Sequence, residues 1–508
     1  MKALELHGAG LTLAQVGEVA RGGRPVKLAA RALPRLKASR RVVEAALEKG
    51  APAYGINTGL GRLSDVRIEP ARIRELQVNL VRSHACGVGA PLAAEVVRAM
   101  LLLRANSLAK GFSGVRPRVV EALCGLLNRK VHPVVPAQGS VGASGDLAPL
   151  AHMTLVLIGE GEAEAGTRKL PGEQALRAAG IKPLRLEAKE GLSLLNGTQA
   201  MLACGILAWL DIQRLADAAD VIGALSLEAL RGTPVAFDAR LQEVRGHRGQ
   251  TTVAARLRRL IAGSAIRRSH LHCGRVQDAY SLRCMPQVHG AVRDTLDFTA
   301  ATFTAEANAA VDNPLVFATG GAGAGDVLSG GNFHGEPLAF ALDYLAIVVT
   351  ALAGISERRT ERLVNPALNE GLPAFLAPHP GLESGLMMSQ VSAAALVAEN
   401  RVLAHPASVD SITTSGNKED YVSMGMGAAL KLQRVVANTA AVLGIELISA
   451  SHALVHLQPL LPSPRLQRVL KMVRERIPPL TADRVQAGDI AAAAAMVLAG
   501  EVEEATSS

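Results

Sequence analysis

Aromatic residues and cysteines are scarce in this sequence. Phe, Trp and Tyr make up 3% of the 508 residues, and Trp209 is the single tryptophan. The core must therefore be filled mainly by Ala, Leu and Val, which suits close packing of helices. The five cysteines are Cys86, Cys124, Cys204, Cys273 and Cys284. Because their number is odd and no CxxC pair occurs, we expect neither a disulfide framework nor a zinc knuckle, and the cytoplasm is the expected location.

Several features of nucleic-acid-binding, exported and membrane proteins are also missing. The formal net charge is +9, but Lys and Arg are scattered without a long basic run, so we expect no nucleic-acid partner. The first ten residues, MKALELHGAG, contain an early acidic residue and no apolar core of a signal peptide. The best candidate for a membrane span, residues 345–354, is shorter than the roughly 18 apolar residues required, so we expect no membrane partner.

Helical periodicity dominates the chain after about residue 95. With 49% apolar and 19% charged residues, the composition is that of a globular protein. Residues 71–82, 198–231, 336–364, 384–403 and 424–454 have apolar residues at helical spacing. Several of these segments are Ala-rich and apolar on more than one face, which predicts burial in a bundle or a subunit interface. Residues 131–136 are a short extended candidate.

These patterns predict a mainly α fold with two domains. Residues 1–110 mix short helical patterns with Gly-rich turns and are expected to form a loop-rich N-terminal domain. Residues 111–508 are expected to form a long central helical bundle, with no linker inside it. No internal repeat occurs, and the low-complexity patch GGAGAG at residues 320–325 is expected to be a flexible surface loop.

The segment GSVGASGDLAPLAHM, residues 139–153, has the strongest chemical signal. A hydrolase nucleophile elbow, GxSxG, is excluded because Asp146 stands where the turn needs glycine. Backbone cyclisation is a second interpretation, since the amide nitrogen of Gly145 could reach the carbonyl carbon of Ala143 in a tight turn. Loss of two waters, one of them carrying the Ser144 hydroxyl, would then leave an electrophilic ring. A plain Gly/Ser turn before a helix is the third interpretation, and the segment alone leaves it open.

Further blocks in the chain resemble one enzyme family. They are YGINTGLG at 54–61, SHACGVGAP at 83–91, LLNGTQ at 194–199, VQDAYSLRC at 276–284, DNPL at 312–315, SGGNFHGEP at 329–337 and NKEDYVSMG at 417–425. In this order they resemble blocks of the aromatic amino acid ammonia-lyases, which form 4-methylideneimidazole-5-one (MIO) from an Ala-Ser-Gly triplet. The resemblance implies an MIO made from Ala143, Ser144 and Gly145, and a fold similar to the fumarase and aspartase architecture.

The resemblance also implies catalytic and substrate-binding residues. Tyr54 corresponds to the base that removes the β-proton, and Tyr280 to a residue that assists the MIO and proton handling. Arg283 resembles the clamp on the substrate carboxylate, a natural use of the planar guanidinium. Tyr280 and Arg283 are spaced i, i+3, which could place both on one side of a turn. The remaining residues implied in the pocket are Asn196, which bonds substrate or MIO oxygen, Gln277 and Phe333.

Three positions bear on the substrate. Histidine-specific members of the family carry Ser-His in the second loop, as at His84, but tyrosine enzymes also have His there, so His84 alone does not separate the two. Glu in the last block, as at Glu419, is the sharper marker, because phenylalanine and tyrosine enzymes have Gln at that position. Met387 resembles a side-chain contact of the histidine-specific members. The resemblance therefore implies conversion of L-histidine to trans-urocanate and ammonia. Tyr421 departs from the expected His, and its phenol could instead meet the hydroxyl of a tyrosine substrate.

The sequence leaves other functions open. The alternatives are a tyrosine or phenylalanine ammonia-lyase, an MIO-dependent 2,3-aminomutase, or a catalytically silent helical assembly protein. His452 and His456 are spaced i, i+4 but lack the Glu of an HExxH motif, and GGAGAG lacks the Lys and Ser/Thr of a phosphate loop. We therefore expect no metal, nucleotide or pyridoxal phosphate. The resemblance implies a homotetramer whose active sites are shared between subunits. Ala279 and Cys86 are two further, harmless departures from the family pattern.

Overall fold

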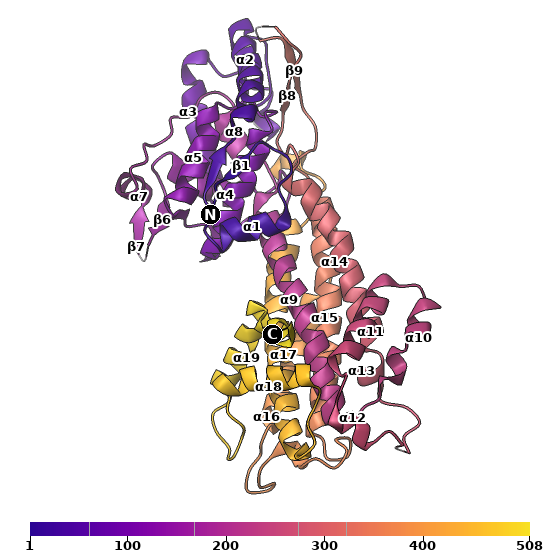
Figure 1. Ribbon diagram of the computed structural model, residues 1–508. Helices are drawn as coiled ribbons and strands as arrows, with labels where there is room; N and C mark the ends of the chain where they lie inside the picture. The colour runs from indigo at the N-terminus through magenta and orange to yellow at the C-terminus, as the bar shows by residue number, and fades with distance from the viewer. Residues whose placement is uncertain (60, 167, 273, 322, 508) are drawn as a thin grey trace. The chain divides into compact units, whose positions relative to one another are not determined.

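The contacts within the chain divide it into two compact units. The computed structural model describes residues 1–59, 61–166, 168–272, 274–321 and 323–507. The first unit is formed by Met1–Leu207, Ala300–Asp343 and Pro406–Leu430, and the second by Ala208–Thr299, Tyr344–His405 and Lys431–Ser508. Neither unit ends at residue 110, so a domain boundary at that position stays a prediction. In the described part the fold is mainly α, as predicted (Figure 1).

Among the residues that the structure describes, the first unit combines helices with four small sheets. Its helices are α1 (Leu13–Ala20), α2 (Leu33–Lys49), α3 (Ile73–His84), α4 (Ala94–Ala109), α5 (Pro117–Asn128), α6 (Leu147–Leu157), α7 (Gly172–Ala178) and α8 (Glu190–Leu195). Strands β1 (Leu4–Leu6) and β2 (Val26–Leu28) are parallel. Antiparallel pairs join β3 (Val88–Pro91) to β5 (Pro136–Gln138), β4 (Val131–Pro133) to β6 (Glu162–Ala165), and β6 to β7 (Arg168–Pro171). The extended candidate at 131–136 is thus partly the strand β4.

The Gly-rich patch at 320–325 lies in a β-hairpin. Strands β8 (Leu315–Ala318) and β9 (Gly325–Leu328) are antiparallel, with Val316 opposite Val327. The patch supplies the turn between them and the first residue of β9, with one of its six residues outside the described ones. The sequence pattern missed this hairpin because each strand has only four residues and the turn composition resembles that of a flexible linker.

The second unit is almost entirely helical. Its helices are α10 (Ala239–Glu243), α11 (Arg248–Leu260), α12 (Ala265–Ser269), α13 (Tyr280–Arg283), α16 (Met387–Leu403), α18 (Pro464–Arg476), α19 (Ala487–Ala499) and α20 (Glu501–Ser507). Four longer helices contain residues of both units: α9 (Gln199–Ala229), α14 (Met285–Ala307), α15 (Glu336–Val364) and α17 (Gly425–Ala453). The predicted helices at 198–231, 336–364, 384–403 and 424–454 are confirmed as α9, α15, α16 and α17, within three residues at each end. Within this unit, small apolar residues of α15, α16 and α17 form one core cluster around Ala353, Val397 and Ile445.

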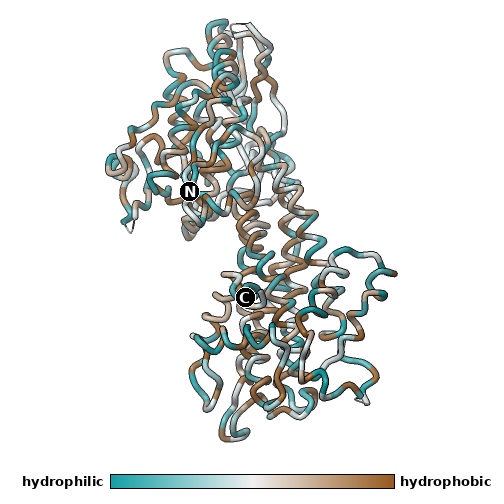
Figure 2. Tube along the Cα trace, viewed as in Figure 1, coloured by the Kyte–Doolittle hydropathy of each residue, from teal (hydrophilic) through white to brown (hydrophobic). Residues whose placement is uncertain are grey.

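Two of the long helices are more apolar than the sequence pattern indicated. By length and composition, Glu336–Val364 and Gly425–Leu457 could each cross a membrane, so the expectation that no apolar run approaches that length was wrong. Along the long helices, hydrophobic and hydrophilic residues are interspersed (Figure 2). However, 56% and 78% of their most apolar windows are buried inside the protein itself. Core helices of a folded chain have the same property, so these two helices are weak support for a membrane span.

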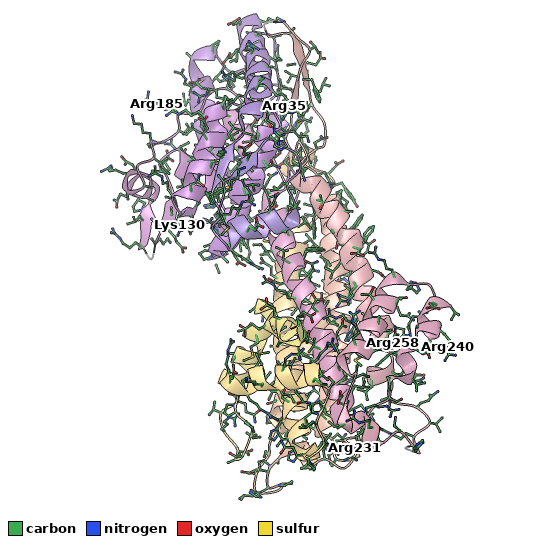
Figure 3. The ribbon with its side chains drawn as sticks, in the orientation of Figure 1. Arg35, Lys130, Arg185, Arg231, Arg240 and Arg258 are labelled. Atoms are coloured by element: carbon green, nitrogen blue, oxygen red, sulfur yellow. The ribbon has the colours of Figure 1, made fainter. Side chains whose placement is uncertain are left out.

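Basic residues are spread over many segments. Six of them are labelled in Figure 3: Arg35 in α2, Lys130 before β4, Arg185 before α8, Arg231 after α9, Arg240 in α10 and Arg258 in α11. These six residues therefore contribute to no single basic helix face.

Candidate active site

A cavity of about 1100 Å³ in the first unit brings predicted site residues together. Six of the twelve predicted residues line it: Tyr54, His84, Ser144, Asn196, Phe333 and Glu419. They come from loops and helix ends that lie far apart in the sequence. Ala143 and Gly145 flank Ser144 in the same loop. Catalytic groups carried by loops on a helical scaffold are a common arrangement in enzymes.

The loop around Ser144 depends on glycine at two positions. Gly142 and Gly145 have φ angles of +70° and +72°, which residues with a side chain rarely adopt. A Cβ on Gly145 would lie 2.4 Å from the carbonyl oxygen of Gly197, and one on Gly142 would lie 2.1 Å from Ser423 Oγ. The Ser140 hydroxyl bonds to the Gly142 amide at 3.1 Å, which closes the turn further. The backbone is therefore compressed where cyclisation would need it.

Asp146 fastens this loop to the start of α9. One carboxylate oxygen accepts the backbone N–H groups of Ala200 and Met201 at 3.0 and 2.8 Å, and the other accepts the Ser140 hydroxyl at 2.9 Å. The first N–H groups of a helix have no partner within the helix and favour a negative charge. Asp146 is fully buried, and burial raises its pKa to about 6 despite these three donors. The carboxylate therefore links the N-termini of α6 and α9.

Ser144 is held from two sides. Its carbonyl oxygen accepts a hydrogen bond from Asn196 Nδ2 at 3.0 Å, and its hydroxyl donates to Glu419 Oε1 at 2.5 Å. The other Glu419 oxygen accepts the hydroxyls of Thr414 and Ser415, both at 2.7 Å. Burial alone would raise the pKa of Glu419, but the hydrogen bonds from Ser144, Ser415 and Thr414 outweigh it and lower the pKa below its ordinary value. Glu419 is therefore an ionised acceptor beside the loop.

His84 ends α3 with a defined ring orientation. Its Nδ1 lies 2.9 Å from the carbonyl oxygen of Leu80 and 3.0 Å from Ser83 Oγ. Because a carbonyl oxygen can only accept, Nδ1 carries the proton and Nε2 is left as an acceptor. Burial lowers the pKa of His84 more than the Leu80 carbonyl and the Glu419 charge raise it, so the ring is neutral at pH 7. His84 and Glu419 are thus two acceptors on one cavity.

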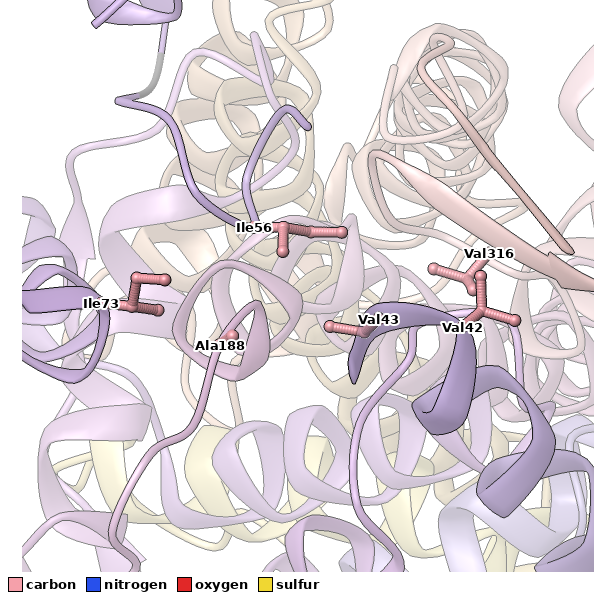
Figure 4. Packing of buried hydrophobic residues seen from close by; sticks show 6 residues of the cluster. All are labelled: Val42, Val43, Ile56, Ile73, Ala188 and Val316. Atoms are coloured by element: carbon pink, nitrogen blue, oxygen red, sulfur yellow. The ribbon is translucent and has the colours of Figure 1, made fainter. Parts of the chain in front are cut away.

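The loop that carries Tyr54 is anchored by an apolar cluster. Ile56, two residues after Tyr54, is completely buried, and it packs in the cluster drawn in Figure 4 with Val42, Val43, Ile73, Ala188 and Val316. Asn57 closes the turn, because its Oδ1 accepts the Ala53 amide at 2.7 Å and its Nδ2 donates to the Ala51 carbonyl at 2.9 Å. The phenolic oxygen of Tyr54 accepts the Gly61 amide at 3.3 Å. The described part of the loop therefore holds the phenol at the cavity.

Comparison with known proteins identifies the family. A family model described as aromatic amino acid lyase matches residues 11–475. The chain belongs to the aromatic amino acid lyase family. It is similar to the histidine ammonia-lyase of Koribacter versatilis (strain Ellin345), with 61% identity over 99% of each chain. Its fold is similar to that of the histidine ammonia-lyase from Trypanosoma cruzi, with a TM-score of 0.92, 41% identity and coverage of 100% of this chain and 95% of that chain.

A further solved structure has a different named activity. The tyrosine aminomutase from Streptomyces globisporus has a TM-score of 0.94 and 37% identity, covering 100% of this chain and 98% of that chain. The resemblance found in the sequence blocks is thus confirmed at the level of the aromatic amino acid lyase family, and the protein is a carbon–nitrogen lyase. MIO is the prosthetic group typical of this family. The compressed Gly142–Gly145 backbone fits such a group, because side chains at both glycines would collide with neighbouring atoms.

Four predicted residues belong to the second unit and are not among the described residues that line the cavity: Gln277, Tyr280, Arg283 and Met387. Arg283 Cζ lies 4.5 Å from the centre of the Tyr280 ring, as their spacing predicted. Tyr280 is 71% exposed, and Arg283 Nε is buried without a described partner. Family membership is consistent with a role for this pair, but their roles stay a prediction.

Tyr421, which stands where the family pattern has His, is not among the described residues that line the cavity. Its ring stacks on His334, with centroids 6.2 Å apart, and its carbonyl oxygen lies 3.3 Å from His334 Nε2. The side chain is 61% exposed. Tyr421 is therefore explained by packing against His334, while Glu419, two residues earlier, lines the cavity.

The cavity also contains polar residues that the sequence reasoning missed. Arg62, Asn79, Asn313 and Lys418 all line it. Asn313 Oδ1 accepts the Gly330 amide at 2.8 Å and the Ser329 hydroxyl at 3.0 Å. Lys418 and Asn313 lie inside the quoted blocks, and Arg62 follows one directly, so the blocks located these residues without showing that they face the cavity.

The histidine pair in α17 and the 3-10 turn after it does not resemble a metal site. The rings of His452 and His456 lie 5.3 Å apart edge to face, and His452 Nε2 bonds to the Leu376 carbonyl at 3.1 Å. Over the described ranges, no group of three or more His, Cys, Asp or Glu side chains could hold a metal ion. Four cysteines are free thiols, while the fifth, Cys273, lies outside the described residues.

Proposed function

We propose that the protein eliminates ammonia from L-histidine to give trans-urocanate, the first step of histidine degradation. The observation that carries this proposal is the meeting of His84, Glu419 and Ser144 on one cavity. Both His84 Nε2 and Glu419 accept hydrogen bonds, so they suit an imidazole ring, which has one N–H donor when neutral and two when protonated. A phenyl ring would leave these groups unpaired, at a cost of about 1–3 kcal/mol each. The high identity to proteins named histidine ammonia-lyase supports the same substrate.

In this proposal, MIO is formed from Ala143, Ser144 and Gly145. The Gly145 nitrogen bonds to the Ala143 carbonyl carbon and one water leaves; a second water takes the Ser144 hydroxyl and its α-hydrogen. The mature group supplies a strong electrophile that none of the twenty side chains provides. Its formation also removes the hydroxyl that occupies Glu419 Oε1 in the encoded chain. One Glu419 oxygen then becomes free for the substrate ring, while Thr414 and Ser415 still hold the other.

Tyr54 is proposed as the base that takes the β-proton of the substrate. Its phenolic oxygen lines the cavity and accepts the Gly61 amide, a donor that stabilises negative charge on that oxygen. Asn196 holds the Ser144 carbonyl and orients the electrophilic loop. Phe333 supplies an apolar wall.

The carboxylate clamp is assigned to the second unit. Arg283 would bind the substrate carboxylate, with Tyr280 assisting the proton and Gln277 and Met387 contacting the substrate. We propose a homotetramer in which these residues complete the active sites of other subunits. An apolar surface pocket between α14 and α15 supports assembly, because Phe298 and Tyr344 expose 59% and 47% of their surface there. Clustered exposed aromatics of this kind are typical of subunit interfaces.

The second candidate function is that of a tyrosine or phenylalanine ammonia-lyase or a 2,3-aminomutase. The likeness to tyrosine aminomutase favours it. Glu419 opposes it, because it lines the cavity and stands where the phenylalanine and tyrosine enzymes have Gln. We further propose a cytoplasmic enzyme that uses no metal, nucleotide or nucleic acid.

Incubation with each aromatic amino acid tests the proposal. L-Histidine should give trans-urocanate, and phenylalanine and tyrosine should react roughly 10⁴-fold less well, as expected for a site built around polar groups. Chromatography of the products separates unsaturated acids from β-amino acids. Faster conversion of tyrosine than of histidine at matched concentration would contradict the substrate, and a β-amino acid product would indicate a mutase. Intact-mass analysis should show a chain lighter by two waters, and Ser144→Ala should lack this loss.

A further inference from the structure

Arg104 is a buried cation that the roles above do not use. It belongs to α4, whose residues from Val96 to Ala109 are all buried in the first unit. The Arg104 side chain is completely buried, and burial lowers its pKa to about 10, so it remains charged at neutral pH. The negative charge of Asp312 favours the charged form of Arg104. Burying a charge in a helical core is costly, and an apolar residue would serve the packing equally well.

Arg104 bonds to residues on both sides of the turn between α8 and α9. Its Nη1 donates to Gln199 Oε1 at 3.0 Å and to the Val311 carbonyl at 2.8 Å, and its Nη2 donates to the Ser193 carbonyl. Ser193 lies in α8 and Gln199 begins α9, so Arg104 bonds on both sides of the turn that joins these helices. A Cβ on Gly197, within the turn, would lie 2.4 Å from Arg104 Nη1. The guanidinium is therefore packed directly beneath the turn.

The same turn touches the loop that is proposed to cyclise. Asn196 Nδ2 bonds to the Ser144 carbonyl at 3.0 Å, and the Gly197 carbonyl accepts the Asp146 amide at 2.7 Å. Gly145 and Gly197 also form an isolated parallel bridge. Contacts to residues 144, 145 and 146 thus come from two adjacent residues, and Arg104 bonds to the chain on either side of them.

We propose that Arg104 is a positioning residue for formation of the prosthetic group. It clamps the Asn196–Gly197 turn, and the turn presses the Ala143-Ser144-Gly145 loop into the geometry in which the Gly145 nitrogen meets the Ala143 carbonyl carbon. This role rests on the proposed function. Intramolecular bond formation is very sensitive to placement, and a displacement of about 1 Å can cost about 10²-fold in rate. Loss of the clamp should therefore slow cyclisation before it affects the fold.

The test compares Arg104→Lys with Arg98→Lys. Lysine keeps the charge at either position but cannot reach all the acceptors of a guanidinium. Arg98 is a matched control, because it is a buried arginine on the same helix that bonds to the carbonyls of Val19, Ala20 and Leu127 and does not line the cavity. Each protein is made by cell-free synthesis, and its intact mass is followed in time. Circular dichroism and size-exclusion chromatography report on folding and assembly.

We expect cyclisation of Arg104→Lys to be at least roughly tenfold slower than that of wild type, with Arg98→Lys unchanged. Equal rates for all three proteins would overturn the role of Arg104. If Arg104→Lys does not fold, Gln199→Met tests the role of Arg104, because this variant keeps Arg104 and removes one of its hydrogen-bond acceptors. Slower cyclisation of Gln199→Met supports the proposal, and an unchanged rate overturns it. A wild-type chain that never loses two waters would instead contradict the proposed function.

Discussion

At the scale of single residues, Glu419 has two oxygens with different surroundings. Oε2 is held by the hydroxyls of Thr414 and Ser415, which fixes the plane of the carboxylate. Oε1 is bonded to Ser144 alone among the described side chains. Dehydration of Ser144 would therefore produce the electrophile and expose the ring-binding oxygen in one event. This coupling explains how the ionised Glu419 carboxylate can be hydrogen-bonded before the MIO forms and free to bind the substrate ring afterwards.

The first prediction concerns Glu419→Gln. The amide keeps the size of the side chain but loses the charge, and a hydrogen bond from a substrate N–H to a charged acceptor contributes about 1.5–3 kcal/mol. We expect histidine turnover to fall by about 10–10²-fold, while intact mass still shows the loss of two waters. An unchanged kcat/KM for histidine would contradict a role for Glu419 in ring recognition.

Tyr54→Phe is the second prediction and tests the base. Removal of one hydroxyl leaves the Ile56 anchor intact, so folding and the mass loss should be preserved. Turnover should decrease by at least about 10²-fold, the low end for a general base. Steady-state kinetics with histidine measures this, and activity within a few-fold of wild type would assign the β-proton to another group.

Single residues also show what a sequence can predict of a site. Tyr54, His84, Ser144, Asn196 and Glu419 were inferred from family blocks, and they line one cavity. The blocks did not identify Arg62, Asn313 or Lys418 as cavity residues, because a linear pattern does not show which polar residue of a loop faces the cavity. That depends on contacts such as the hydrogen bonds between Asn313, Ser329 and Gly330, which join residues 16 and 17 positions apart.

At the scale of elements, the long helices were predictable and the short strands were not. Residues 336–364 match α15 at both ends, because Pro337 near its N-terminus and apolar residues at helical spacing, from Leu338 to Leu363, mark its extent. Strands of three or four residues, such as β8 and β9, are stabilised mainly by pairing with a partner that the local sequence does not reveal. Whether such short strands form depends on strand pairing and tertiary packing, which the periodicity of the sequence does not reveal.

The third prediction concerns the acid stability of the contact between α17 and residues 478–486. Burial lowers the pKa of His452 to about 4, helped by the nearby charges of His456, Arg484 and Arg474. The ring donates from Nε2 to the Leu376 carbonyl, so Nδ1 must stay unprotonated to accept the amide of Leu480 at 3.4 Å.

Because the unfolded chain takes up this proton near pH 6.5 and the folded chain only near pH 4, the free energy of unfolding should fall as the pH is lowered between these values. This pKa difference corresponds to a loss of at most about 3 kcal/mol in the free energy of unfolding. His452→Gln removes it, so the variant should lose less stability than wild type between pH 7 and pH 4.5. Urea unfolding at fixed protein concentration measures this, with His456→Gln as control. Parallel pH profiles for wild type and His452→Gln would exclude His452 as the cause.

At the scale of the whole molecule, family membership was predictable because the blocks occur in order along most of the chain. The division into compact units was not, since each unit is assembled from three separated segments. Four long helices contribute residues to both units, so no local change in composition marks a boundary. The assignment of Arg283 and Tyr280 to one unit and of Tyr54 and Ser144 to the other follows from the contacts alone.

The last prediction uses this division to test whether active sites are shared between subunits. Tyr54→Phe and Arg283→Ala should each be nearly inactive alone. When both chains are co-expressed with different tags and the mixed assemblies are isolated, some sites should receive Tyr54 from an Arg283→Ala chain and Arg283 from a Tyr54→Phe chain. For random mixing, roughly a quarter of the sites would be intact, and turnover should recover to that level. Tyr54→Phe mixed with Glu419→Gln is the matched control, because both residues line the same cavity of one chain and no intact site can form from them. Recovery in the first mixture and none in the second would support shared sites. If neither mixture recovers, each chain supplies both residues to its own active site, and the proposed sharing between subunits is wrong.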